Sequence, residues 1–181
     1  MKIRNGFVSN SSSSSFIIAV PAGMELTPDN LHKVLYGTSE CVEFSPQYEW
    51  HKNTVVTSMG VVADILAQIE HAEANKKAED ADDADSGDSP LGKVTNLARV
   101  VDDELDIKAF DQFATDKGVD WDAYTQFSDK AREQVANRLQ HTFPNHDFYH
   151  VEFADDNAWG SEVEHGPALN NCENVTRYSH H

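Results

Sequence analysis

The chain has 181 residues, a length that fits one domain, and we predict that residues 1–181 form a single domain. It carries 14 Lys and Arg against 31 Asp and Glu, which gives a net charge of −17 at pH 7. A surface of this sign repels phosphates and disfavours direct nucleic-acid binding. The charge suits a basic protein partner, an imitation of nucleic acid, or simple solubility.

The sequence predicts neither export nor membrane insertion. Lys2 and Arg4 precede an apolar run, but residues 16–20 are too short for the hydrophobic region of a secretory signal. No run approaches the ~20 residues of a membrane span. Cys41 and Cys172 form no CxxC pair, so we expect two buried, unpaired thiols in a reducing cytoplasm.

The first structural signal is a serine-rich block that leads into an apolar run. Residues 16–20 read FIIAV and are stopped by Pro21 and Gly23, which predicts a short buried strand. Both faces of this strand are apolar, so we place it in the interior of a sheet. The Ser and Asn side chains ahead of it favour a loop that can offer hydroxyl and N–H groups to an anion. A low-complexity entry loop without a binding role is the alternative.

Two helices are predicted in the first half of the chain. Thr27 and Pro28 suit the start of a helix, and Gly37 suits its end. A second helix is expected over about residues 54–77, because apolar residues recur there at steps of three and four. These residues are Val55, Met59, Val62, Leu66 and Ile69, and Val61 and Ile65 widen the stripe.

The negative charge is concentrated in the middle of the chain. Residues 78–90 contain six acids, no base and no large apolar side chain, which predicts an acidic mobile loop. Their spacing lacks the glycine and the distal glutamate of a calcium-binding loop. We expect residues 91–140 to form an acidic helical segment, with helices over 94–105, 107–117 and from 121 onward.

The last part of the chain returns to strands. Residues 147–154 alternate, with Tyr149, Val151 and Phe153 on one face. Further strands are expected over residues 159–165 and 174–181. The fold class is therefore α+β: a small antiparallel or mixed sheet made of the first strand and the C-terminal strands, packed with helices and carrying an acidic helical insertion.

Histidines and carboxylates gather near the C-terminus, since six of the nine histidines follow residue 140. Such side chains bind zinc, manganese or iron. The candidate ligands of a divalent transition metal are His150, Glu152, His165 and His180. The sequence has no HExxH motif and no phosphate-binding loop, so the simpler interpretation is surface histidines and no cofactor.

A second candidate site joins two blocks that are distant in the sequence. If the serine-rich entry and the Glu164-His165-Gly166 turn lie at one end of the sheet, they form a single polar site. Hydroxyl and N–H groups would bind an anion there, and His165 would act as acid or base. The members are Asn10, Ser11, Ser12, Ser13, Glu164 and His165.

The block KIRNGFVSNSSSSSFIIAVP resembles the start of a family of uncharacterised proteins from tailed bacteriophages and some bacteria. The similarity continues at Leu35-Tyr36-Gly37, near residues 61–69, in FYHVEFADDNAWGSEVEHG and in the closing Tyr178-Ser179-His180-His181. The family has no assigned activity, so the resemblance implies a viral or mobile-element origin and no site residues.

Together these features predict a phage-type accessory protein in the cytoplasm of the infected bacterial cell. Its first expected function is that of a non-enzymatic, acidic interaction protein acting on a host or virion protein with a basic surface. The alternative is a small metal-dependent or anion-binding enzyme that uses the C-terminal histidines and carboxylates. Neither a membrane nor a nucleic acid is an expected partner.

Overall fold

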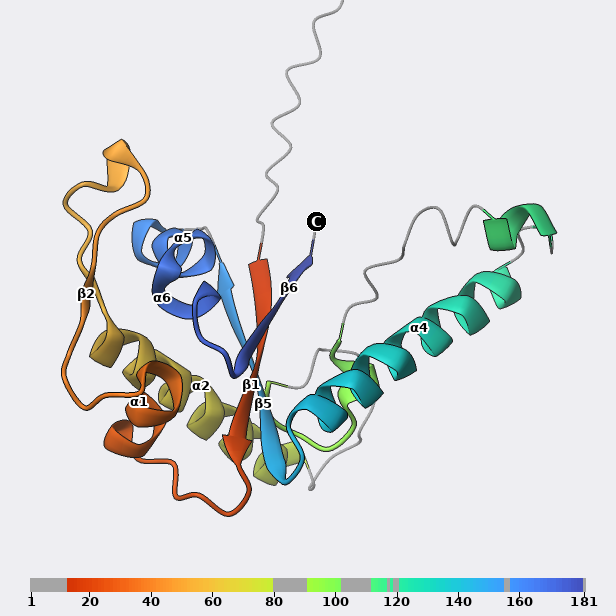
Figure 1. The fold of residues 1–181 in the computed structure, drawn as a ribbon, viewed down its shortest axis with the longest axis horizontal. Helices are drawn as coiled ribbons and strands as arrows, with labels where there is room; N and C mark the ends of the chain where they lie inside the picture. The colour runs from red at the N-terminus through yellow and green to blue at the C-terminus, as the bar shows by residue number, and fades with distance from the viewer. Residues whose placement is uncertain are drawn as a thin grey trace, which may run out of the picture.

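The computed structural model describes residues 13–79, 91–101, 112–116, 118, 121–154 and 157–180. Helices pack against a four-stranded sheet, which confirms the predicted α+β class (Figure 1). In chain order the elements are β1 (Ser13–Pro21), α1 (Pro28–Tyr36), β2 (Glu43–Phe44), η1 (Glu49–His51), β3 (Val56–Thr57), α2 (Ser58–Glu79), β4 (Gly92–Val94), η2 (Leu97–Arg99), α4 (Trp121–Thr142), β5 (His146–Ala154), α5 (Ala158–His165), α6 (Pro167–Asn170) and β6 (Val175–His180).

The sheet has the strand order β4-β5-β1-β6, and every neighbouring pair is antiparallel. β1 is thus an interior strand, as its two apolar faces predicted. Phe16 pairs with Val151 of β5 and with Arg177 of β6. The sheet is built mainly from the two ends of the chain, also as expected.

Successive side chains of β1 enter two different cores. Phe16, Ile18 and Val20 pack into the larger one, with side chains of α1, α2, α5 and α6. Ile17 and Ala19 face the smaller core, which includes apolar side chains of the η2 region and of α4. Figure 1 shows these two groups of helices on opposite sides of the sheet. Because alternate residues of a strand point to opposite faces, the central part of β1, which is covered on both sides, is apolar on both faces.

The first two helices form close to where the sequence placed them. Thr27 caps α1 by accepting the Asn30 N–H at 3.2 Å, and Gly37 ends the helix with a φ of 68°. α2 begins at Ser58 rather than near residue 54, because residues 56–57 form β3. Val55 is therefore not part of the apolar stripe of α2. The buried stripe consists of Val61, Val62, Ile65 and Ile69.

Two predicted elements are wrong. Residues 159–165 are not a strand but the helix α5, whose first turn is capped when the Asn157 side chain accepts the Gly160 N–H at 2.8 Å. Five consecutive residues of α5 are buried, so burial on all sides hid its helical period. Residues 94–105 are not one helix either, because β4 pairs with β5 and the short η2 follows. Residues 102–111 lie outside the described part of the chain.

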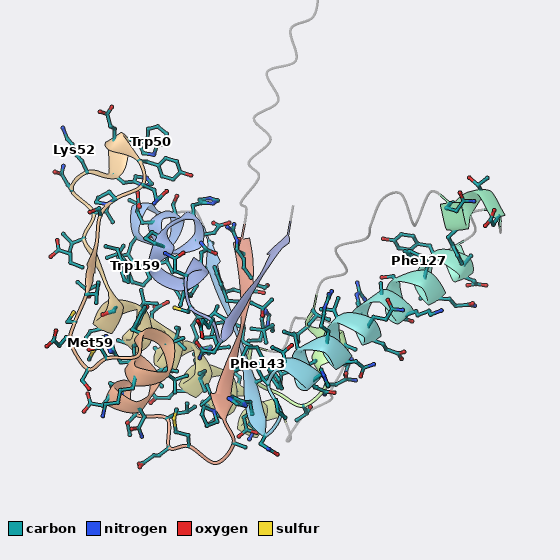
Figure 2. The ribbon with its side chains drawn as sticks, in the orientation of Figure 1. Trp50, Lys52, Met59, Phe127, Phe143 and Trp159 are labelled. Atoms are coloured by element: carbon teal, nitrogen blue, oxygen red, sulfur yellow. The ribbon has the colours of Figure 1, made fainter. Side chains whose placement is uncertain are left out.

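The acidic middle of the chain is described only in part. α2 extends to Glu79, so the start of the predicted acidic loop is helical, and residues 80–90 lie outside the described ranges. The predicted long helix from residue 121 is confirmed as α4. Its C-terminal half contributes Ala136 and Leu139 to the smaller core. Its first half, which carries Phe127, projects away from the sheet (Figure 2). No helix among the described residues is long and apolar enough to cross a membrane.

The two cysteines are unpaired, but their environments differ. Cys172 is buried, and this burial raises the pKa of its thiol to about 11. Cys41 is exposed, contrary to the prediction that both thiols are buried. It follows α1 in the connection toward β2, where the chain runs over the surface.

Gly160 allows α5 to start directly against the end of β5. A Cβ atom at this position would lie 2.1 Å from the carbonyl oxygen of Ala154. We expect Gly160→Ala to lower the free energy of unfolding by about 1–3 kcal/mol, because backbone must shift to relieve the overlap. Urea denaturation at neutral pH measures this change.

Gly60→Ala is the matched control. Gly60 also lies in the first turn of its helix and donates its N–H to a capping side chain, Thr57, at 3.1 Å. Its added Cβ would meet two side chains, the Thr57 hydroxyl at 3.1 Å and the Trp159 ring at 3.9 Å, and not a backbone atom. An equal loss of stability in both variants would contradict the close-approach explanation for Gly160.

Candidate functional site

The start of β1 lies against the last turn of α5, so the two blocks that the sequence analysis joined do meet. The Ser14 hydroxyl donates to Glu164 Oε1 at 2.7 Å, and both side chains are fully buried. Asn10, Ser11 and Ser12 lie outside the described residues, as does the side chain of Ser13. The described core of the site is therefore the Ser14–Glu164 pair.

Arg177 of β6 completes this pair. Its Nη2 and Nε donate to the Ser14 hydroxyl at 2.8 and 3.1 Å, and Nη2 lies 3.6 Å from Glu164 Oε1. Ser14 thus connects a half-exposed guanidinium to a buried carboxylate. The sequence analysis missed Arg177, because strand alternation predicts its face but not the register that places it opposite Phe16.

The second oxygen of Glu164 faces a histidine. Its Oε2 has no hydrogen-bond partner among the described residues, and His165 Nε2 lies 3.7 Å away. The His165 side chain is 29% exposed, whereas that of Glu164 is fully buried. The separation of 3.7 Å is longer than a hydrogen bond of about 2.6–3.2 Å. The acid or base role of His165 stays a prediction.

A second carboxylate of α5, Glu162, binds the segment that contains η1. It accepts the backbone N–H groups of Gln47 at 2.5 Å and Tyr48 at 3.3 Å. His51 Nδ1 lies 3.0 Å from Glu162 Oε1, and the Glu162 side chain is only 3% exposed. One buried side chain therefore fixes the backbone of this surface segment. The prediction of a strand over residues 159–165 hid this role.

Aromatic rings stack on the outer side of that anchor. Tyr48 and Trp50 are nearly parallel, with ring centroids 4.8 Å apart and an interplanar angle of 11°. The Tyr48 ring also makes edge contacts with His51 and with His165 of α5, at centroid distances of 5.6 and 6.1 Å. Trp50 remains 75% exposed and lies at the outer end of the segment (Figure 2).

The described donors of this site already have acceptors within it. Ser14 donates to Glu164, and Arg177 donates to Ser14. The predicted anion site stays a prediction, because Asn10, Ser11 and Ser12 lie outside the described residues.

The four metal candidates do not form one site among the described side chains. His150 pairs with Ile17, whose side chain enters the smaller core, and its Nε2 lies 3.7 Å from Glu152 Oε1. Glu164 and His165 lie toward the opposite face, which Ser14 shares with Phe16. The side chain of His180 is not described. Among the described residues no three His, Cys, Asp or Glu side chains are placed to hold a metal ion.

Comparisons of the chain with protein-family models, with curated proteins and with solved structures found no match. A functional proposal therefore depends on the geometry described above. The resemblance of the N-terminal block to phage proteins remains a prediction.

Ser14→Ala tests the central contact of this site. The substitution removes a hydrogen bond from buried Glu164 and the acceptor of Arg177, so we expect the free energy of unfolding to fall by about 1–3 kcal/mol. The exposed Ser39 provides the control, and Ser39→Ala should be nearly neutral. Urea denaturation of both variants gives the comparison, and a neutral Ser14→Ala would show that the contact contributes little.

Glu162→Gln tests the anchor. The amide keeps the size of the side chain but has one acceptor oxygen, and its NH₂ group faces donors. We expect hydrogen exchange at the Gln47 and Tyr48 amides to become about tenfold faster, which corresponds to a loss of about 1.4 kcal/mol of protection. Glu70→Gln, on the exposed side of α2, should leave that exchange unchanged. Equal protection in both variants would contradict the anchoring role.

Proposed function

We propose that this protein is a non-enzymatic interaction protein that binds a basic host or virion protein through the segment of residues 42–55. The resemblance of the N-terminal block to phage proteins supports this class of partner. The proposal places the protein in the cytoplasm of the infected bacterial cell.

The main support for this proposal is the distribution of exposed apolar side chains. Among the described residues, three large apolar side chains are exposed: Val42 at 40%, Val55 at 58% and Trp50 at 75%. All three lie in the one segment that connects α1 to α2. An exposed apolar patch is a common mark of a protein interface, and tryptophan is enriched among the residues that dominate binding energy.

The segment is also ordered before any partner binds. Tyr48 stacks on one face of Trp50, and Glu162 holds the backbone beneath it. A side chain that is already held in place loses less conformational entropy on binding, which leaves more of the contact energy for affinity. A flexible surface loop would lack this advantage.

The charge of the protein supports a basic partner. The net charge is −17, and the segment with its immediate flank contains the exposed acids Glu40, Glu43 and Glu49 as well as the exposed apolar side chains. Lys52 is the one lysine of this stretch. Complementary charge in an interface speeds association and makes it sensitive to salt. A segment with exposed apolar and acidic side chains therefore favours a partner that combines apolar contacts with a basic surface.

A photocrosslinking amino acid at position 52, which leaves Trp50 in place, tests the proposal in the infected cell. We expect one discrete adduct from position 52 and none from position 129, an exposed site on the projecting half of α4. Mass spectrometry identifies the adduct, and binding is then measured with the purified partner. The absence of an adduct at position 52, or equal adducts at both positions, would contradict the proposal.

Trp50→Ala should weaken binding to that purified partner by at least about tenfold, as expected for a central interface tryptophan. Asp129→Ala should change the affinity by less than about twofold, because its charge lies far from the apolar segment. Thermal unfolding of both variants reports whether the fold is intact. Unchanged affinity of a folded Trp50→Ala variant would exclude this surface as the binding site.

A further inference from the structure

A cavity opens at the end of β1 opposite to Ser14, because β6 is shorter than its neighbours. The pairing of β1 with β6 begins at Ile18–Val175, whereas its pairing with β5 continues to Pro21–His146. Asn174 covers only Ala19, whose N–H donates to the Asn174 carbonyl at 2.8 Å. Beyond that point the edge of β1 borders a cavity of about 490 Å³, a volume typical of small-molecule sites.

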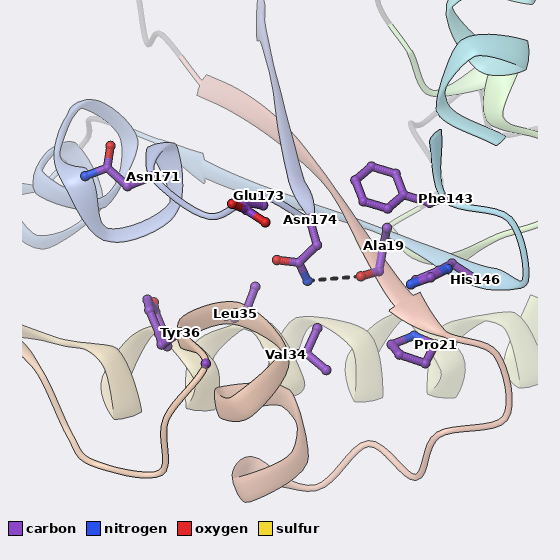
Figure 3. A pocket seen from close by; sticks show the side chains of 11 residues that line it. Ala19, Pro21, Val34, Leu35, Tyr36, Phe143, His146, Asn171, Glu173 and Asn174 are labelled. Atoms are coloured by element: carbon purple, nitrogen blue, oxygen red, sulfur yellow. Dashed lines mark hydrogen bonds between the residues drawn. The ribbon is translucent and has the colours of Figure 1, made fainter. Parts of the chain in front are cut away.

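The walls of this cavity come from four segments (Figure 3). Pro21 of β1 and Leu35 of α1 give it an apolar side. Phe143, just after α4, lies at one end beside His146 of β5, with ring centroids 5.6 Å apart. Tyr36 lies at the other end (Figure 3). These apolar walls can therefore contact a ligand that has about the size of one aromatic ring with a short chain.

Three polar side chains of the cavity, Asn174, His146 and Glu173, offer acceptors, and Tyr36 and Asn171 also line it. Asn174 Nδ2 donates to the Ala19 carbonyl at 3.0 Å, which leaves its Oδ1 as an acceptor. His146 Nδ1 must donate to the Pro144 carbonyl at 3.0 Å, so Nε2 of the neutral ring is also an acceptor. Glu173 adds a carboxylate, and no described Lys or Arg lines the cavity.

We propose that this cavity binds a small organic amine with an apolar body. A protonated amine supplies the N–H donors that the carboxylate and the two acceptors lack, and its charge complements that of Glu173. Its apolar part lies against Leu35 and Phe143. The face of the Phe143 ring also attracts a cation. A carboxylate or phosphate ligand would find no positive side chain among the described lining residues. The site is separate from the proposed protein-binding segment.

Titration of the full chain with 2-phenylethylamine tests this proposal. Amide signals of ¹⁵N-labelled protein report the place of binding, and we expect shifts at Leu35, Phe143 and Asn174. The neutral 2-phenylethanol should bind about fivefold more weakly, because it lacks the charge that pairs with a solvent-exposed carboxylate. The anionic 3-phenylpropanoate should bind more weakly still.

Glu173→Gln should weaken amine binding by about fivefold and leave alcohol binding unchanged. Asp129→Asn removes the same charge from the projecting half of α4 and should leave both affinities unchanged. Thermal unfolding confirms that each variant is folded. The proposal is overturned by no amine binding up to about 10 mM, by equal affinity for amine and alcohol, by shifts located elsewhere, or by a folded Glu173→Gln variant that binds the amine normally.

Discussion

The pairing of β1 between β5 and β6 is the constraint on which the rest of the structure depends. It places the first described residues between two strands from the end of the chain, so the sheet requires contacts across nearly the whole sequence. The side chains of Ile17 and Ile18 enter two separate cores, and β5 also contributes to both, with Phe148 in the smaller core and Val151 in the larger. Contacts of such sequence separation carry a larger loop-closure entropy, which slows folding. The helices have a common packing surface only when the C-terminal strands are paired with β1.

The same strand borders both candidate sites, the polar cluster around Ser14 and the cavity next to Pro21. At its start, Ser14 is carried into the larger core and meets Glu164, because α5 crosses that end of the sheet. At its other end, β1 and β5 extend past the first residue of β6, and the unpaired edge borders the cavity next to Pro21. The polar cluster and the cavity thus lie at opposite ends of β1. Neither requires the residues of the other.

The sequence predicted elements whose signals are local. β1 was recognisable from its apolar run, and α1 from Thr27 and Gly37, because capping and burial depend on neighbouring residues. α5 was mistaken for a strand, since burial on every side removes the amphipathic period. Of the predicted polar site, the structure describes Glu164 with Ser14 from the serine-rich block, whereas Asn10, Ser11 and Ser12 lie outside the described residues. The sequence did not indicate the roles of Arg177 and Glu162, because these roles depend on strand register and on how the segment with η1 folds back on α5.

The two buried carboxylates of α5 serve different purposes, and the difference connects the interior with the exposed tip. A buried charge is tolerated only when hydrogen bonds or an opposite charge offset its lost hydration. Glu162 meets this condition with two backbone N–H groups and His51, which fixes the chain directly below Trp50. Glu164 meets it on one oxygen only, through Ser14 and the nearby Arg177. Since the two acids lie on one short helix, the position of the exposed tryptophan depends on the same packing that holds Ser14 at the start of β1. The segment of residues 42–55 is therefore not an independent surface loop, because the helix that anchors it also contacts the start of β1.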